Sequence, residues 1–224
     1  MKRNATAPLI LATAFVQASC AEPAPSRDET AESSSAGSAS EQDAFFSALS
    51  SHCGNAYSGQ LVSDDPVDAD FASAEMVMHV RECSPDAISV PFHVKTAEGW
   101  DRSRTWVLSR TESGLRLKHD HRHEDGTSDA VTMYGGDTAD AGTSQSQDFP
   151  IDQESIDLFQ REGLTASLTN VWTVEIDPAG TDDAAFAYQL RRTVDGGAPE
   201  ERFFRAEFDL TDPVIAPPPA WGHD

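Results

Sequence analysis

Basic residues are scarce in this chain of 224 residues. Sixteen lysines and arginines stand against 38 aspartates and glutamates, which gives a formal net charge of −22. A surface of this sign repels the phosphate backbone of nucleic acids, whose binding depends mainly on lysine and arginine. It also disfavours docking on anionic lipid through charge alone. The composition therefore argues against a nucleic-acid-binding protein and indicates a well-solvated exterior.

Long apolar runs are also missing. The longest lies near the N-terminus, where PLILATAFV covers residues 8–16, whereas about 20 apolar residues are needed to cross a bilayer. This run follows the basic start MKR and precedes the small residues of QASCAEP. Such an arrangement is typical of a secretory signal, so we expect residues 1–19 to be a signal peptide.

Cysteine is rare as well, with three residues in the whole chain. Cys20 follows Ala18 and Ser19 at the end of the apolar run, which resembles a bacterial lipoprotein signal, although Gln17 stands where that signal usually has leucine. The resemblance implies that Cys20 is lipidated and that this lipid is the protein's only attachment to a membrane. The alternative is cleavage near Ala18 or Ala21, which would release a soluble secreted protein.

The remaining cysteines, Cys53 and Cys83, form an even pair once Cys20 is assigned to the lipid. In an oxidising periplasm such a pair joins as a disulfide. We therefore expect the protein in the bacterial cell envelope, lipid-anchored in the periplasm or at the outer membrane.

The domain organisation follows from composition. Between Ala21 and Ser40 there is no large apolar side chain, so this stretch cannot bury enough surface to fold. We expect residues 20–40 to comprise the lipidated cysteine and a flexible tether, residues 41–211 to form one folded domain, and residues 212–224 to be a proline-rich tail.

Apolar and polar residues alternate through most of this domain, which is typical of strands with one buried face. Nine strands are expected, at residues 57–63, 76–83, 88–94, 104–111, 115–123, 128–134, 167–176, 184–193 and 202–210. Two helices are expected, a short one from Ser40 towards Gly54 and one over residues 153–162 that ends at Gly163.

Short strands with hairpin-length connections predict an all-β fold, a single antiparallel meander barrel, because closure removes the unpaired edges of a sheet. A two-sheet β-sandwich is the alternative. The order of a short N-terminal helix, a meander and one late helix resembles the calycin (lipocalin-like) barrels. The stretches DRSRTW (residues 101–106) and LKHDHRHEDG (residues 117–126) resemble those of uncharacterised bacterial envelope proteins, which implies a location but no chemistry.

Three histidines occur at every second position in KHDHRHEDG, residues 118–126. Because alternate side chains of a strand share one face, His119, His121 and His123 continue the core-facing row that Leu115 and Leu117 begin. The charged residues between them are expected to face solvent.

The expected hairpin register brings aromatic and basic side chains to these histidines. A turn at residues 113–114 would place Trp106 opposite His121 and Arg104 opposite His123. On the other side of the strand, an Asp-Gly turn at residues 125–126 would start the hairpin that leads to Tyr134.

One interpretation of the histidine row is a metal site. Histidines two apart on a strand face can ligate one zinc ion, so His119 and His121 are the candidate ligands and zinc is the candidate cofactor. His119 and His123 are about 13 Å apart along a strand and cannot share an ion directly. This interpretation predicts a metal-dependent enzyme or a metal carrier.

A second interpretation is a polar ligand pocket at one end of the barrel. Arg102 and Arg104 precede Trp106 on the same expected face, and an arginine fork suits a carboxylate or phosphate. The other residues expected to line this pocket are His121, His123, Tyr134 and Asn170. This interpretation predicts a small anionic or amphipathic ligand.

A third interpretation is structural. The histidines would then face water or pair with acids such as Asp101 and Asp137, in a structural or protein-interaction module of the envelope. The sequence has no G-x-S-x-G elbow, H-E-x-x-H helix or phosphate-binding glycine loop, so enzymatic activity and oligomeric state are left open. Of the three, envelope-tethered binding of a small ligand is the function that we favour.

Overall fold

Strands make up most of residues 41–223, the residues that the computed structural model describes. The strands are β1 (Ala56–Leu61), β2 (Met76–His79), β3 (Glu82–Cys83), β4 (Ala87–Lys95), β5 (Trp100–Thr111), β6 (Gly114–His121), β7 (Tyr134–Asp137), β8 (Ser146–Pro150), β9 (Val171–Ile176), β10 (Ala185–Arg192) and β11 (Arg202–Val214). The helical segments are α1 (residues 41–50), α2 (Gln153–Arg161) and the 3-10 turns η1 (Pro66–Asp68) and η2 (Thr165–Ser167). The expected signal peptide, the lipidated Cys20 and the tether lie outside the described residues.

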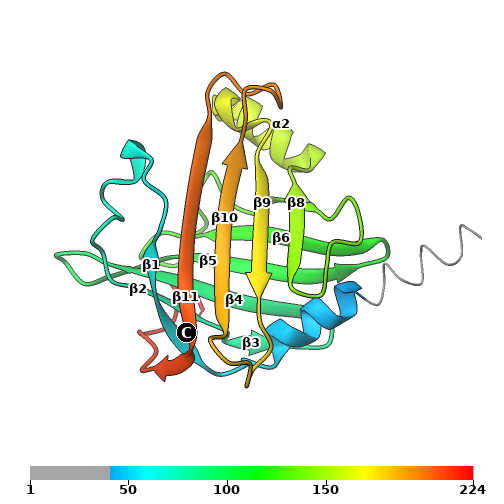
Figure 1. Ribbon diagram of the computed structural model, residues 1–224. Coiled ribbons are helices and arrows are strands. Elements are labelled where there is room, and N and C mark those ends of the chain that lie inside the picture. Colours follow the sequence, from blue (N-terminus) through cyan, green and yellow to red (C-terminus); the bar gives the residue numbers. More distant parts are fainter. Residues whose placement is uncertain (1–40, 224) are drawn as a thin grey trace, which may run out of the picture.

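All strands belong to one antiparallel sheet, in the order β7-β6-β5-β4-β2-β1-β11-β10-β9-β8, with β3 paired to β4 beside this path. The first and last strands of this order, β7 and β8, meet through a single bridge between Gly136 and Ile151. The Asp152 amide also donates to the Gly135 carbonyl (3.0 Å). The sheet is therefore a nearly closed barrel (Figure 1), and the predicted meander barrel is confirmed over the sandwich.

The closing seam depends on two glycines. A Cβ atom on Gly135 would lie 1.9 Å from the Leu117 carbonyl oxygen of β6, and one on Gly136 would lie 1.9 Å from the Pro150 carbonyl oxygen of β8. No side chain fits at such distances. The sequence YGGD, which has the composition of a loop, is therefore a strand that only glycine allows to fit between its neighbours.

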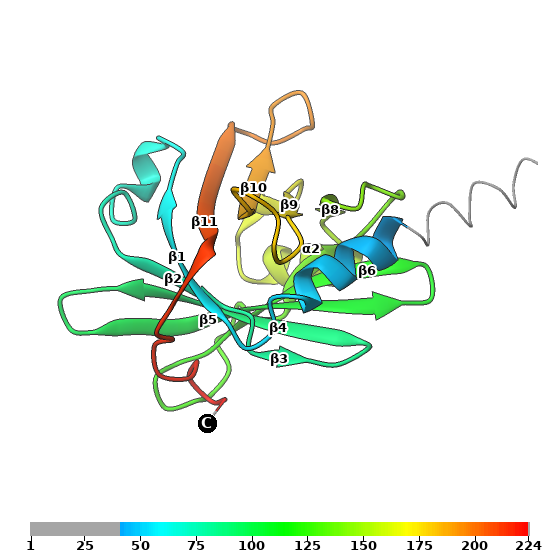
Figure 2. The ribbon, with the colours of Figure 1, turned by 60° about the horizontal axis from the view of Figure 1, so that its bottom comes forward.

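Helix α1 closes one end of the barrel. Its Phe45 and Leu49 side chains are fully buried in the core. The Gln42 amide group donates to the Asp140 carbonyl (3.0 Å) beyond the end of β7. In Figure 1, α1 lies at the lower end, where β9 finishes, and α2 lies at the upper end, where β10 finishes. The upper end is thus free of α1, and we call it the mouth of the barrel. Figure 2 views the molecule after a turn that brings the closed end forward.

The predicted disulfide between Cys53 and Cys83 is confirmed, with the two Cα atoms 6.3 Å apart. It joins the turn after α1 to β3, at a sequence separation of 30 residues. The bond therefore ties the helix at the closed end to the wall of the barrel.

The prediction of a strand at residues 128–134 is wrong. Residues 122–133 form a loop with one isolated bridge, between Arg122 and Ser128. The Asp129 carboxylate accepts a hydrogen bond from the Val131 amide (2.7 Å), and such local bonds compete with a strand ladder. Conversely, β8 is a strand that alternation does not predict, because its sequence SQDFP is mostly polar. Strand β11 continues into the segment expected to be a tail.

The register of β5 on β6 differs by two residues from the expected one. The turn consists of residues 112–113, so Arg104 lies opposite His121 and Trp106 opposite His119. Because a shift by two residues keeps each side chain on its own face, His119 and His121 still belong to the inward row.

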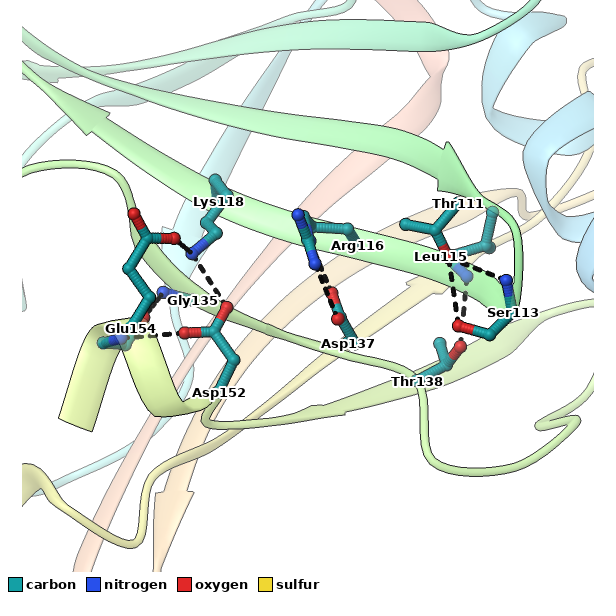
Figure 3. A network of polar contacts seen from close by, with 11 residues as sticks. Thr111, Ser113, Leu115, Arg116, Lys118, Gly135, Asp137, Thr138, Asp152 and Glu154 are labelled. Atoms are coloured by element: carbon teal, nitrogen blue, oxygen red, sulfur yellow. Dashed lines mark hydrogen bonds and ion pairs between the residues drawn. The ribbon is translucent and has the colours of Figure 1, made fainter. Parts of the chain in front are cut away.

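The outer face of β6 differs from the expectation. Lys118 and Asp120 are each 6% exposed, although alternation predicts both in solvent. The Lys118 ammonium group lies 2.8 Å from Asp152 and 2.9 Å from Glu154, at the start of α2 (Figure 3). The Asp120 carboxylate lies 3.0 Å from a ring nitrogen of His223 near the C-terminus. Asp120 also pairs with Arg122, two residues along the chain (2.9 Å), so ion pairs compensate both buried charges.

The Lys118 cluster joins β6, β7 and α2. Asp152 caps α2 by accepting a hydrogen bond from the Ser155 amide (2.8 Å), and the Ser155 hydroxyl accepts one from the Gly135 amide (2.7 Å). Two residues before Lys118 on the same face, Arg116 pairs with Asp137 through two bonds of 2.6 and 2.8 Å (Figure 3). The Arg116 pair is more open, since its side chains are 41% and 37% exposed.

We expect Lys118→Met to destabilise the fold far more than Arg116→Met. The first change leaves the Asp152 carboxylate, 15% exposed, without its buried cation, and breaking such a pair costs about 3 kcal/mol. The second removes an exposed pair, which typically contributes about 1 kcal/mol or less. Urea unfolding of both variants measures the difference, and equal losses would contradict a structural role for the Lys118 cluster.

Candidate functional site

The mouth of the barrel contains a pocket of about 210 Å³. Its walls are mainly apolar and come from both halves of the sheet: Phe71, Phe92, Trp106, Tyr134, Leu190 and Phe204. The polar residues that share the lining are Asp68, Arg104, His119, His121, Tyr188 and Arg202. Aromatic walls with convergent polar groups are typical of a small-molecule site.

Trp106 is the centre of the apolar wall. Its indole stacks on the Tyr188 ring, with centroids 4.4 Å apart, and on the Phe92 ring, with centroids 4.9 Å apart. The side chain is 3% exposed. Trp106 therefore joins β4, β5 and β10 across the barrel and presents little of its own surface to the pocket.

His119 lies at the base of the pocket and is neutral. Burial lowers its pKa to about 3, and the residue is 2% exposed. Its Nδ1 lies 3.1 Å from the Tyr134 carbonyl oxygen, and its Nε2 lies 2.7 Å from the Tyr188 hydroxyl. Burial also raises the pKa of Tyr188, so that hydroxyl keeps its proton. Both nitrogens of the ring are thus hydrogen-bonded.

His121 is nearer the mouth. Its Nε2 lies 3.2 Å from the Tyr134 hydroxyl. Burial and the nearby charge of Arg104 lower its pKa to about 4, and burial raises the pKa of Tyr134. The pair is therefore uncharged at neutral pH, so neither ring adds charge to the pocket.

The two arginines of the pocket differ in what they can still bind. Arg202 is committed to two carboxylates, because its guanidinium holds both oxygens of Asp68 (2.6 Å each) and one of Asp65 (3.0 Å). Arg104 makes one hydrogen bond, from a terminal nitrogen to Asp101 (2.5 Å). Within residues 41–223, its other N–H groups have no partner. Arg104 is therefore the cation that remains available to a ligand.

Arg102 points away from the pocket, whereas alternation predicts that it shares a face with Arg104. Residues 102–103 of β5 oppose the single residue His93 of β4, which is a β-bulge. A bulge re-aims the side chains around it. Arg102 accordingly donates to the Pro219 carbonyl in the C-terminal segment, while Arg104 lines the pocket.

Two further residues expected in the pocket lie elsewhere. His123 is exposed and follows the end of β6. Asn170 is 4% exposed just before β9, and its side-chain oxygen has no hydrogen-bond partner among the described residues. Of the expected lining, the structure thus brings together Arg104, Trp106, His121 and Tyr134, and the metal candidate His119 lines the same pocket.

Sequence reasoning misses three polar residues of the pocket. Alternation with Leu190 places Tyr188 on the inner face, but its contact with His119, 69 residues away, depends on barrel closure. Arg202 likewise alternates with a buried phenylalanine at the start of β11. Asp68 lies in the turn η1, where no pattern marks it.

Metal binding has no support from this geometry. Residues 41–223 contain no group of three or more histidine, cysteine, aspartate or glutamate side chains that could hold an ion. A zinc ion on His119 would have to displace Tyr188 or the Tyr134 carbonyl, and Arg104 pairs with His121 in the sheet. The environment of both histidines thus disfavours a cation.

Comparison with protein-family models, with curated proteins and with solved structures finds no match for this chain. Within residues 41–223 no helix is both long enough and apolar enough to cross a membrane. The site therefore has to be interpreted from its own geometry.

We expect stability to fall as the pH drops from about 6.5 to 4.5, because buried histidines resist protonation. Burial lowers the pKa values of His93, His119 and His121 to about 4, 3 and 4. An unfolded histidine protonates near pH 6.5, so below that pH the unfolded chain binds more protons and is favoured. The stabilisation is complete above pH 6.5 and is lost progressively towards the folded pKa.

Each such histidine contributes about 1.4 kcal/mol per pH unit to this slope. Urea unfolding between pH 4.5 and 6 should show a slope smaller by about this amount in His119→Gln than in the wild type. An unchanged slope would contradict a neutral, buried His119.

Proposed function

We propose that this protein binds a small amphipathic acid, with the apolar part of the ligand in the aromatic pocket and the acidic group at Arg104. The observation that carries the proposal is the Arg104 guanidinium, which lines the pocket and has N–H groups without a partner among the described residues. A guanidinium presents its donors in a planar fork that matches a carboxylate. Aromatic walls around one available cation suit an apolar body with one acidic end.

The size of the pocket narrows the ligand class. Its volume of about 210 Å³ lies below the roughly 300–1,000 Å³ of sites for drug-sized molecules. A single-ring or short branched acid is therefore favoured over a fatty acid or a nucleotide.

The charges around the pocket favour a ligand that carries a single negative charge. The arginines at the pocket, Arg104 and Arg202, stand against three carboxylates, those of Asp65, Asp68 and Asp101. The two pocket histidines are neutral, as their lowered pKa values require. A monocarboxylate can share Arg104 with Asp101, whereas these carboxylates would repel a dianion such as phosphate about twice as strongly.

The proposal also includes a location in the bacterial envelope, with Cys20 lipidated and residues 20–40 as the tether. The signal-like sequence of residues 1–20 supports it. The Cys53–Cys83 disulfide supports it as well, because disulfides persist mainly in oxidising compartments.

Arg104→Gln should weaken the binding of small aromatic acids, whereas Arg102→Gln should not. Benzoate, phenylacetate and 4-hydroxybenzoate are suitable probes for isothermal titration calorimetry. Loss of a charge-assisted hydrogen bond predicts a dissociation constant at least about tenfold higher in Arg104→Gln. Arg102→Gln is the matched control, because it removes an arginine two residues away on the same strand that points away from the pocket.

Two results would contradict the proposal. The first is that the wild type binds none of these acids. The second is that Arg104→Gln binds them as tightly as the wild type does.

A further inference from the structure

The hydroxyl proton of Tyr188 has a fixed direction. A carbonyl oxygen can only accept, so the contact between His119 Nδ1 and the Tyr134 carbonyl (3.1 Å) requires the proton of the neutral ring on Nδ1. His119 Nε2 then carries a lone pair and must accept from the Tyr188 hydroxyl (2.7 Å). The backbone of β7 thereby determines which way a side chain on β10 donates.

The other histidine–tyrosine pair in the pocket has no such constraint. His121 Nε2 contacts the Tyr134 hydroxyl (3.2 Å), and Nδ1 of the same ring has no partner among residues 41–223. Either tautomer of His121 satisfies this contact, since the hydroxyl can donate or accept. This pair can therefore adapt to a ligand that donates or to one that accepts.

Tyr188 cannot adapt in this way. Its proton is used by His119, so the Tyr188 oxygen offers only lone pairs to the space that it lines. The indole N–H of Trp106 also interacts with that oxygen and acts to lower the pKa of Tyr188, so one lone pair is left for a ligand. A ligand group next to it gains a hydrogen bond only if it donates, and an acceptor there would bring two lone pairs together.

Arg104 and Tyr188 are both neighbours of Trp106 and line the same pocket. Arg104 is two residues from Trp106 on the same strand, roughly 7 Å along it, and the Tyr188 ring stacks on the indole at 4.4 Å. Because both residues line one pocket of about 210 Å³, an acid with a single ring can reach the cation with its acidic end and the Tyr188 oxygen with its other end.

We propose that the ligand of this pocket is a hydroxy or amino acid built on a single ring or a body of similar size. Its carboxylate binds Arg104, and its hydroxyl or amino group donates a hydrogen bond to the Tyr188 oxygen. The inference rests on the proposed function and specifies it further, because Tyr188 becomes the residue that discriminates donor-bearing acids from other acids of the same size.

The test compares 4-hydroxybenzoate, 3-hydroxybenzoate and 4-aminobenzoate with benzoate and 4-methoxybenzoate by isothermal titration calorimetry. The wild type should bind at least one donor-bearing acid about three- to tenfold more tightly than benzoate, as expected for one neutral hydrogen bond. The methoxy compound, which can only accept, should bind more weakly than benzoate.

Tyr188→Phe should abolish this preference while benzoate still binds. Tyr134→Phe is the matched control. It removes the other pocket hydroxyl but keeps the backbone carbonyl that orients His119, so the preference for donors should persist in it.

The outcomes separate the inference from the proposed function. If the wild type binds all these acids equally, or if the preference survives in Tyr188→Phe, the role of Tyr188 is overturned and the acid-binding pocket stands. If the wild type binds none of them, both are overturned. Donor preference in the wild type that disappears in Tyr188→Phe alone would establish both.

Discussion

The approach of β7 to its two neighbours is the constraint on which the rest of the structure depends. At Gly135 and Gly136 a Cβ atom would lie 1.9 Å from a carbonyl oxygen of β6 or β8, so closure of the sheet requires two residues without side chains. Closure in turn positions Tyr134, the first residue of β7, against the histidines of β6. The seam that makes the sheet a barrel thus also supplies a wall of the pocket and the carbonyl that orients His119.

Alternation of apolar residues predicts the class of fold because it reports directly which face of each strand is buried. It fails where other interactions determine the backbone. Residues 128–134 alternate, yet Asp129 bonds to the backbone two residues on and a loop forms. Strand β8 is mostly polar and is held by pairing with β9, which a local pattern cannot reveal. The register of β5 on β6 differs by two residues from the expected one because the turn starts one residue earlier. Each side chain nevertheless stays on the face of the sheet that alternation predicts.

The site was predictable as far as it lies on consecutive strands. Arg104 and His121 face the pocket as alternation predicts, since both lie on the β5–β6 hairpin. Arg102 does not, because the β-bulge opposite His93 turns it away. Tyr188 and Arg202 come from strands on the far side of the barrel, and their contacts follow from closure rather than from spacing in sequence. The direction of the hydrogen bond between Tyr188 and His119 likewise depends on contacts between strands that are distant in sequence.

The stack of Trp106 between Tyr188 and Phe92 has an optical consequence. A near-ultraviolet circular dichroism band reflects aromatic side chains held in fixed packing, and this indole is held on two sides at 4.4 and 4.9 Å. It is one of four tryptophans in the chain, and it is the one that lines the pocket. The barrel therefore contains its own chromophore at the point where a ligand would enter, and occupancy can be followed in solution without any label.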